Sequence, residues 1–176
     1  QKVFDFTDSD DRKQMIEARV ASKDPGNWYN MFIINRGLAD GITKNSAVIN
    51  GEGLIGLAYE VGDDWAKIIS IIDNKSSIGF KILDEDRHYE GVINGGIDGQ
   101  LKGVLFDPQA EVNIGDILIT SGKGIYPEGI IIGEITVKIH NEDELLTKVD
   151  VDPSVNFRNL DRVLAIPYSD LQEAGE

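Results

Sequence analysis

The sequence predicts a mainly β protein of two small six-stranded β-barrels, preceded by a short helical or extended lead-in. From Met15 onward, short apolar runs alternate with turn signals, and 19 glycines among 176 residues punctuate them. About twelve such runs are too many for one small barrel, so we divide them between two. The expected division is a lead-in at 1–15, a first barrel at 16–76, a second at 77–168 and a polar tail at 169–176. The pattern leaves open whether the last strand returns to the first barrel.

Each expected strand is an apolar run bounded by Gly, Pro, Asn or Asp. The clearest is 131–139, where glycine and apolar residues occupy odd positions and Glu134, Thr136 and Lys138 lie between them. This period of two is typical of a half-buried antiparallel strand. The twelve strands are expected near 16–22, 29–35, 47–49, 54–61, 65–72, 78–83, 91–93, 103–106, 116–120, 130–139, 147–151 and 162–166.

Several turns have specific chemistry. The sequence Asp-Pro-Gly-Asn at 24–27 places proline and glycine where a type II turn requires them. Asn50-Gly51, Asn94-Gly95 and Asp98-Gly99 are pairs that favour hairpin turns, because both residue types tolerate positive φ.

Charge and composition exclude several functions. The formal net charge of −14 disfavours binding to nucleic acid and to anionic lipid headgroups. The chain has no cysteine, which excludes a disulfide framework, a thiolate metal site and a cysteine nucleophile. It has no apolar run of about 18 residues of the kind that spans a bilayer as a helix. No cofactor is expected.

Three clusters stand out in the sequence. The first is D-P-G-N-W-Y-N at 24–30, the second is G-L-I-G at 53–56, and the third is G-D-I-L-I-T-S-G at 115–122 followed by Y-P-E-G at 126–129. The third cluster describes a strand, a glycine-flanked turn, a Pro-x-Gly turn and a second strand. It fits a structural hairpin, and its loop is also the best candidate for binding a partner.

In this order and spacing, the clusters resemble the MreC family of rod shape-determining proteins. The A-R-V stretch at 18–20 and the R-V-L stretch at 162–164 fit as well, so the resemblance covers residues 16–166. The T-S-G and P-x-G elements of the third cluster are its most specific part.

The resemblance implies a non-enzymatic scaffold of bacterial cell-wall elongation that maintains rod shape. It implies a single-pass membrane anchor upstream of this chain, a coiled-coil segment, and two barrels displayed outside the membrane. The implied partners are a class B penicillin-binding protein, MreD and other proteins of peptidoglycan synthesis. Further copies of the same protein are expected too, as a homodimer or a higher assembly.

Two sets of residues follow as candidates. Exposed aromatic side chains are common in interfaces, so the loop around Tyr126 is a candidate contact. A partner could also bind by adding a strand to an exposed barrel edge. The candidate partner-binding residues are Ser121, Lys123, Tyr126, Pro127 and Glu128. The candidate structural anchors are Pro25, Trp28, Tyr29, Gly56, Gly115, Asp116, Gly122 and Gly129.

Two alternative functions stay open, a serine hydrolase on a protease-like double barrel and a surface sugar-binding β-module. Ser121 is followed by glycine, as a nucleophile could be, but a triad also needs a histidine base and an orienting acid. His88 is too close in sequence for a first-barrel histidine, and His140 follows the serine. No catalytic residue is therefore assigned.

No metal site is assigned either. A calcium loop starting at Asp8 has Lys13 where glycine is needed. Two histidines without cysteine do not favour a zinc site.

Overall fold

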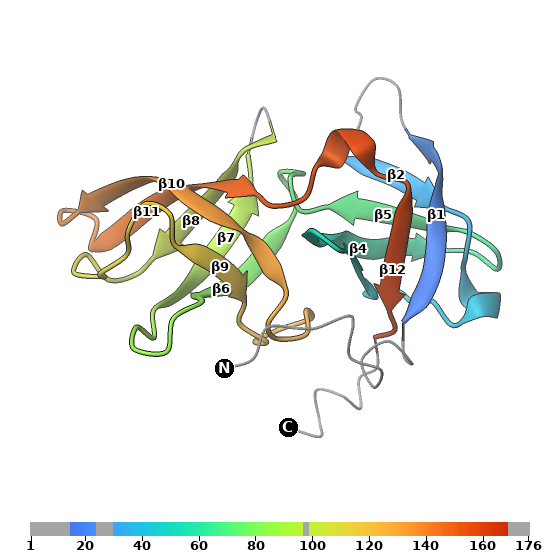
Figure 1. Cartoon of the computed structure of the whole chain (residues 1–176), viewed down its shortest axis with the longest axis horizontal. Helices are drawn as coiled ribbons and strands as arrows, with labels where there is room; N and C mark the ends of the chain where they lie inside the picture. The colour runs from blue at the N-terminus through green and yellow to red at the C-terminus, as the bar shows by residue number, and fades with distance from the viewer. Residues whose placement is uncertain (1–14, 24–29, 97–98, 169–176) are drawn as a thin grey trace. The chain divides into compact units, whose positions relative to one another are not determined.

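The structure is a computed structural model, and it describes residues 15–23, 30–96 and 99–168. Within these ranges the chain is built from short antiparallel strands, as the sequence predicts (Figure 1). Every expected strand is present to within a few residues. The lead-in, the type II turn at 24–27 and the tail lie outside the described residues, as does the start of the strand expected at 29–35.

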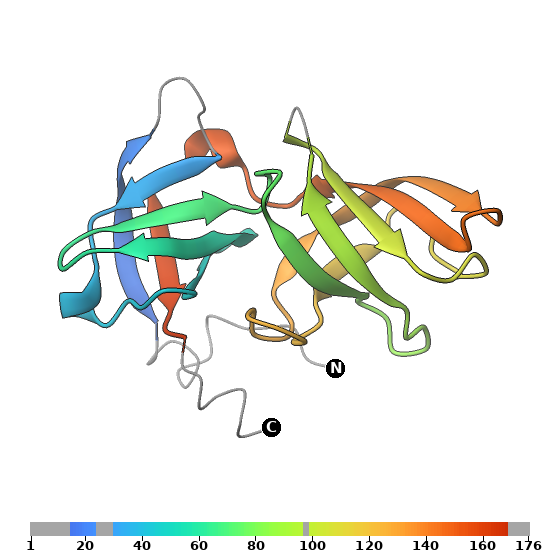
Figure 2. The same ribbon diagram turned by 180° about the vertical axis from the view of Figure 1, so that it is seen from behind.

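The first barrel is closed in the order β1-β12-β3-β4-β5-β2, with all neighbours antiparallel (Figure 2). Because β12 pairs with both β1 and β3, the last strand returns to the first barrel, which the sequence pattern left open. Its strands are β1 (Ile16–Lys23), β2 (Met31–Ile34), β3 (Ala47–Asn50), β4 (Gly53–Val61), β5 (Ala66–Ser70) and β12 (Arg162–Ile166).

The second barrel is closed in the order β10-β11-β8-β7-β6-β9. Its strands are β6 (Ser77–Ile82), β7 (Glu90–Gly95), β8 (Leu101–Leu105), β9 (Ile117–Thr120), β10 (Ile131–Asn141) and β11 (Leu146–Pro153). Residues 71–155 form this compact unit, and the described residues on either side of that range form the other. The expected range of 77–168 left the return of the last strand open, and with β12 in the first barrel the second compact unit ends at 155.

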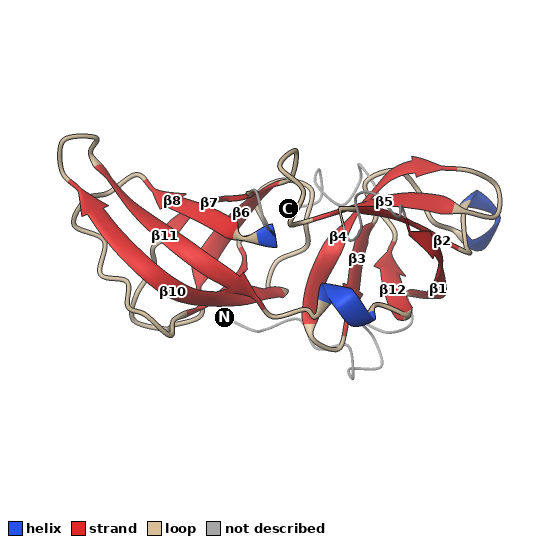
Figure 3. Ribbon diagram, turned by 90° about the horizontal axis from the view of Figure 1, so that it is seen from above, coloured by secondary structure: helices blue, strands red, loops and turns tan. Residues whose placement is uncertain are grey.

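Helical geometry in the described residues is confined to 3-10 turns such as η1 (Leu38–Asp40) and η3 (Phe157–Asn159), drawn in blue in Figure 3. No described helix is long and apolar enough to cross a membrane.

Each barrel has its own apolar core. In the second barrel Phe80 is fully buried, and glycines on neighbouring strands make room for its ring. A Cβ on Gly91 would lie 2.7 Å from Phe80 Cζ, and one on Gly103 would lie 3.3 Å from Phe80 Cε2. A phenylalanine therefore fits inside a narrow barrel because two facing positions carry no side chain.

One hairpin assignment is wrong. Asn94 and Gly95 are the last two residues of β7 and do not form a turn. A Cβ on Gly95 would lie 2.2 Å from the carbonyl oxygen of Asp73, so close backbone approach requires glycine there.

Candidate partner-binding site

The loop at 121–130 connects β9 to β10, and Thr120 fixes its shape. The buried Thr120 Oγ1 donates to the carbonyl of Pro127 at 2.5 Å and accepts from the backbone N–H of Ile130 at 2.9 Å. The backbone of Thr120 also bonds Gly129 and Ile130, at 3.0 and 2.9 Å. The side chain of Thr120, at the start of the motif, thus binds the backbone at its end, on either side of the P-x-G turn. The sequence analysis quoted Thr120 within the motif but did not select it.

Two of the candidate anchors are glycines that this loop requires. Gly122 has φ +81° and Gly129 has φ +93°, which are left-handed conformations that other residues adopt at a cost. A Cβ on Gly122 would also lie 2.8 Å from the Cβ of Glu128. Conformation and space therefore both favour glycine at position 122.

Two ion pairs hold the loop against β6 and β7. Lys81 on β6 is only 8 % exposed, and its Nζ is paired with the Glu128 carboxylate. Lys123 Nζ bonds Glu90 Oε2 on β7 at 2.7 Å. The second pair is largely exposed and contributes little to stability, whereas Lys81 needs its partner because burying an unpaired ammonium is costly.

A pocket of about 290 Å³ opens beside the loop. It brings together three of the five candidate partner-binding residues, Ser121, Lys123 and Glu128. Other residues that the sequence analysis did not select complete its lining: Lys81, Ile82, Arg87, His88 and Glu90. Tyr126 and Pro127 are half-buried and do not line this pocket.

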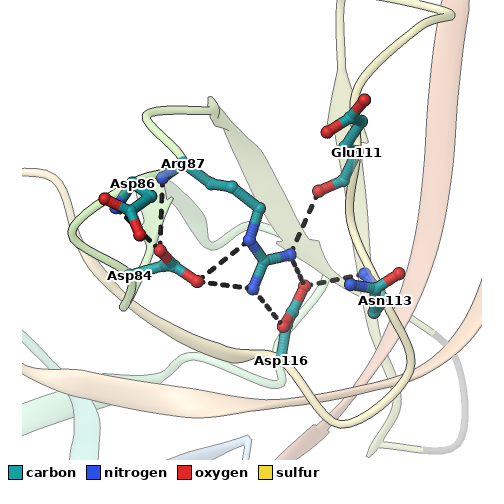
Figure 4. A network of polar contacts seen from close by, with 6 residues as sticks. All are labelled: Asp84, Asp86, Arg87, Glu111, Asn113 and Asp116. Carbon is teal, nitrogen blue, oxygen red and sulfur yellow. Dashed lines mark hydrogen bonds and ion pairs between the residues drawn. The ribbon is translucent and has the colours of Figure 1, made fainter.

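Arg87 organises the loop before β7 (Figure 4). Its Nη1 and Nη2 donate to the two oxygens of Asp116 at 2.7 and 2.8 Å, and its Nε and Nη2 donate to Asp84 Oδ2 at 3.0 and 2.8 Å. The carbonyl of Glu111 accepts from Nη1 at 3.1 Å. Two carboxylates therefore share one guanidinium with paired, charge-assisted bonds.

The same network explains the anchor Asp116. Its Oδ2 also accepts from the backbone N–H of Asn113 at 2.7 Å, which closes the turn before β9. Burial alone would raise the pKa of Asp116, but the hydrogen bonds from Arg87 and Asn113 outweigh burial and hold the pKa below its usual value. The backbone N–H of Asp86 and the side chain of Arg87 likewise lower the pKa of Asp84.

The candidate anchors Gly115 and Gly56 have different surroundings. Gly115 has φ +97° and open space around the position of a Cβ. A Cβ on Gly56 would lie 2.2 Å from the carbonyl oxygen of Ile69 on the neighbouring strand. The anchors Pro25, Trp28 and Tyr29 lie outside the described residues.

Tyr126 gives a prediction for alkaline conditions. Burial raises the pKa of its phenol to about 12. An unfolded tyrosine ionises near pH 10, so folded Tyr126 resists ionisation and the free energy of unfolding falls as the pH rises from about 10 to 12. We expect Tyr126→Phe to reduce this fall in urea denaturation at a series of pH values. Tyr59→Phe, at a half-exposed ring, is the control, and an equal effect of both variants would contradict the assignment.

Ser121 and His88 line the same pocket, but among the described residues Ser121 is hydrogen-bonded to neither His88 nor His140. Ser121 Oγ accepts from the backbone N–H of Lys123 at 3.3 Å. The ring Nδ1 of His140 lies 3.0 Å from the carbonyl of Pro108 and 3.2 Å from Thr147 Oγ1. In the part of the chain that the structure describes, three or more metal-ligating side chains nowhere gather into a site.

Comparison with known proteins identifies the family. The model of "Rod shape-determining protein MreC, barrel core" matches residues 20–167. The cell shape-determining protein MreC of Geobacillus stearothermophilus is 30 % identical over 91 % of this chain and 60 % of its own length. This chain therefore spans about three fifths of that relative.

Solved structures share the fold. An MreC structure from Listeria monocytogenes has a TM-score of 0.82 and 27 % identity, covering 88 % of this chain and 76 % of its own. A structure described as the major periplasmic domain of MreC has a TM-score of 0.76 and 24 % identity, covering 88 % and 96 %. The MreC of Helicobacter pylori, solved in complex with the penicillin-binding protein PBP2, has a TM-score of 0.67 and 16 % identity, covering 86 % and 98 %. With the family model matched over nearly the whole described chain, this protein belongs to the MreC family of rod shape-determining proteins.

Proposed function

We propose that this chain is the extracytoplasmic part of a non-enzymatic scaffold that organises cell-wall elongation and so maintains rod shape. The match of the family model to residues 20–167, which covers most of both barrels, carries the proposal. The hydrogen-bonded loops of the second barrel support it, because a preformed binding surface loses little conformational entropy when a partner binds.

The proposed partners are a class B penicillin-binding protein, the membrane protein MreD and further copies of this chain. The complex of the Helicobacter pylori relative with PBP2 supports the first of these. Family membership supports the other two, and also a single membrane span outside this chain that holds the barrels on the outer face or in the periplasm.

The proposed contact surface is the loop at 121–130 with the rim of its pocket. The T-S-G and P-x-G motif fixes this loop through Thr120, while Lys123 keeps 76 % of its side chain exposed. A scaffold that binds one conformation of its enzyme partner better than another shifts the partner toward that conformation. No chemistry by the scaffold itself is required.

Loop variants test this surface. Replacing a contact residue at the centre of an interface weakens binding by about tenfold or more. We therefore expect Tyr126→Ala, Pro127→Ala and Lys123→Ala to weaken capture of the purified penicillin-binding protein by about tenfold.

Lys67→Ala is the matched control, because Lys67 is also a partly exposed lysine paired with a glutamate, Glu60, on the first barrel. Thermal unfolding of each variant separates lost contacts from lost folding. Unchanged binding by all three folded loop variants would exclude the loop as a contact.

A serine hydrolase is the second candidate function, favoured by one observation: Ser121 and His88 line the same pocket. A fluorophosphonate probe distinguishes the two proposals. Labelling of the folded chain that is lost in Ser121→Ala would favour the hydrolase, and absence of labelling would leave the scaffold.

The sugar-binding module predicts binding of soluble muropeptides, so a panel without binding would argue against it.

A further inference from the structure

Among the residues that the structure describes, no strand pairs with one edge of the second half of β10. β9 pairs with β10 from Ile131 to Glu134, and the backbone of Ile135 bonds Gly115 and Asp116 at 2.9 Å each. From 136 to 141, the only backbone partner among the described residues is β11 on the other side. Figure 1 shows the β10–β11 hairpin continuing past the end of β9.

Two features produce this edge. The register of β10 shifts against β9 between Ile131 and Gly133 and against β11 between Ile135 and Val137, and such bulges bend a strand away from its neighbour. Gly115, with φ +97°, turns the chain just before β9, and the last backbone bonds from this segment to β10 are those at Ile135. The free edge is six residues long, or about 20 Å.

The inner face of the hairpin is fixed. His140 Nδ1 lies 3.0 Å from the carbonyl of Pro108, and Thr147 Oγ1 donates to the carbonyl of Asp107 at 2.8 Å. The loop after β8 therefore holds this face of the hairpin. A preorganised edge loses little conformational freedom when another strand is added to it.

One row of paired residues on the outer face carries three apolar side chains and one lysine. Ile139 pairs with Lys148, which pairs with Val104, which pairs with Val92. Ile139 is 54 % exposed and Val137 is 40 % exposed, although both are β-branched residues suited to a covered strand. Exposed edges pair with other chains unless bulges or charges blunt them, and here the bulge at 136 and Lys138 leave Val137 and Ile139 as the exposed apolar part of the edge.

The charge of the hairpin indicates its partner. Between 131 and 153 the sequence has six carboxylates and two lysines, and three of the carboxylates form the turn at 142–144. Lys148 is paired with Glu144 at 3.5 Å. The edge at 136–141 itself carries Lys138 and no carboxylate, so lysine or arginine side chains on an added strand would be attracted to the acidic turn at 142–144.

We infer that the edge of β10 at 136–141 binds an extended, basic segment of a partner protein as an added β-strand. Backbone hydrogen bonds hold the segment, its apolar side chains lie over Val137 and Ile139, and its cations face the acidic turn. The inference deepens the proposed scaffold function by naming a second contact surface and the chemistry of the segment that it takes.

Hydrogen exchange tests the edge directly. The probe is a capped peptide of about nine residues that alternates lysine and valine, long enough to span the edge. We expect it to slow amide exchange at 136–141 and not in the loop at 121–130. The same peptide with N-methylated valines cannot form the backbone bonds and should have no effect. A peptide with glutamate in place of lysine should bind at least tenfold more weakly.

Side-chain variants complete the test. Val137→Lys with Ile139→Lys places charge on the edge and should abolish protection by the peptide. Ile114→Lys, at another exposed apolar residue of the same barrel, should leave protection unchanged. Absence of protection at 136–141, or equal protection in the edge variant, would overturn the inference. Protection that appears without peptide and grows with protein concentration would also overturn it, because the occupant would then be a second copy.

Capture of the penicillin-binding protein separates this inference from the proposed function. If the wild-type chain and the edge variant capture it equally well, the scaffold proposal stands and the edge inference fails. If neither captures it while the peptide protects 136–141 in the wild-type chain, the edge binds a strand but the proposed partner is wrong.

Discussion

Replacing Gly56 with alanine is expected to lower the free energy of unfolding by about 3 kcal/mol or more, the range of severe overpacking. An added Cβ would lie 2.2 Å from the carbonyl oxygen of Ile69 and 2.9 Å from the Cα of Ser70. Both atoms belong to the backbone of β5, which cannot move without opening its pairing with β4. Urea denaturation of the purified chain measures the loss.

Gly115→Ala is the matched control in the same set of anchors. A Cβ there meets no atom within 4 Å, so only the left-handed φ of +97° resists alanine. That strain costs about 1–2 kcal/mol, and asparagine tolerates the conformation better than alanine does. We expect the order of stability to be wild type, Gly115→Asn, Gly115→Ala, Gly56→Ala. Equal losses at the two glycines would show that the close approach at Gly56 is relieved by movement of β5.

Removing the carboxylate of Asp116 is expected to destabilise the second barrel by about 2–3 kcal/mol, because a partly buried guanidinium loses one of its two paired acceptors and the turn before β9 loses another. Asp116→Ala removes two bonds from Arg87 and one from the N–H of Asn113. Asp150→Asn is the control, since Asp150 pairs with the exposed Lys102 on the same barrel. A pair of that kind contributes about 1 kcal/mol or less.

The same network predicts the direction of an acid effect. The pKa values of Asp84 and Asp116 are lower in the folded chain than in the unfolded one. Their contribution to stability is therefore present above the unfolded value of about 4 and is lost as the pH falls through the lower folded values. Unfolding of the wild-type chain between pH 6 and about 2 should show this loss, and Asp116→Ala should show less of it. An identical pH dependence in both proteins would contradict the assigned role of Asp116.

Much of the fold could be predicted because a strand in a barrel has a local signature. A period of two, as at 131–139, is visible within one segment, and turn residues mark where the segment ends. Asn94-Gly95 shows the limit of this reasoning. An Asn-Gly pair in isolation favours a turn. In the folded chain Gly95 lies inside a strand, where the backbone of Asp73 comes too close for any other residue.

The candidate site could be predicted only where its residues are close in sequence. Ser121, Lys123 and Glu128 are candidates because they belong to one motif, and all three line one pocket. Their partners come from elsewhere: Lys81 is 47 residues from Glu128, and Arg87 is 29 residues from Asp116. Closure of the barrel brings these pairs together. No local pattern in a single sequence indicates which basic residue pairs with which carboxylate.

The scaffold proposal is tested most directly by capture from cells. The full-length, membrane-anchored protein would be purified from its own cells, and the proteins bound to it identified by mass spectrometry. The proposal predicts enrichment of a class B penicillin-binding protein and MreD. Recovery of neither, under conditions that retain other membrane complexes, would contradict the proposal and make the Ser121 probe the next experiment.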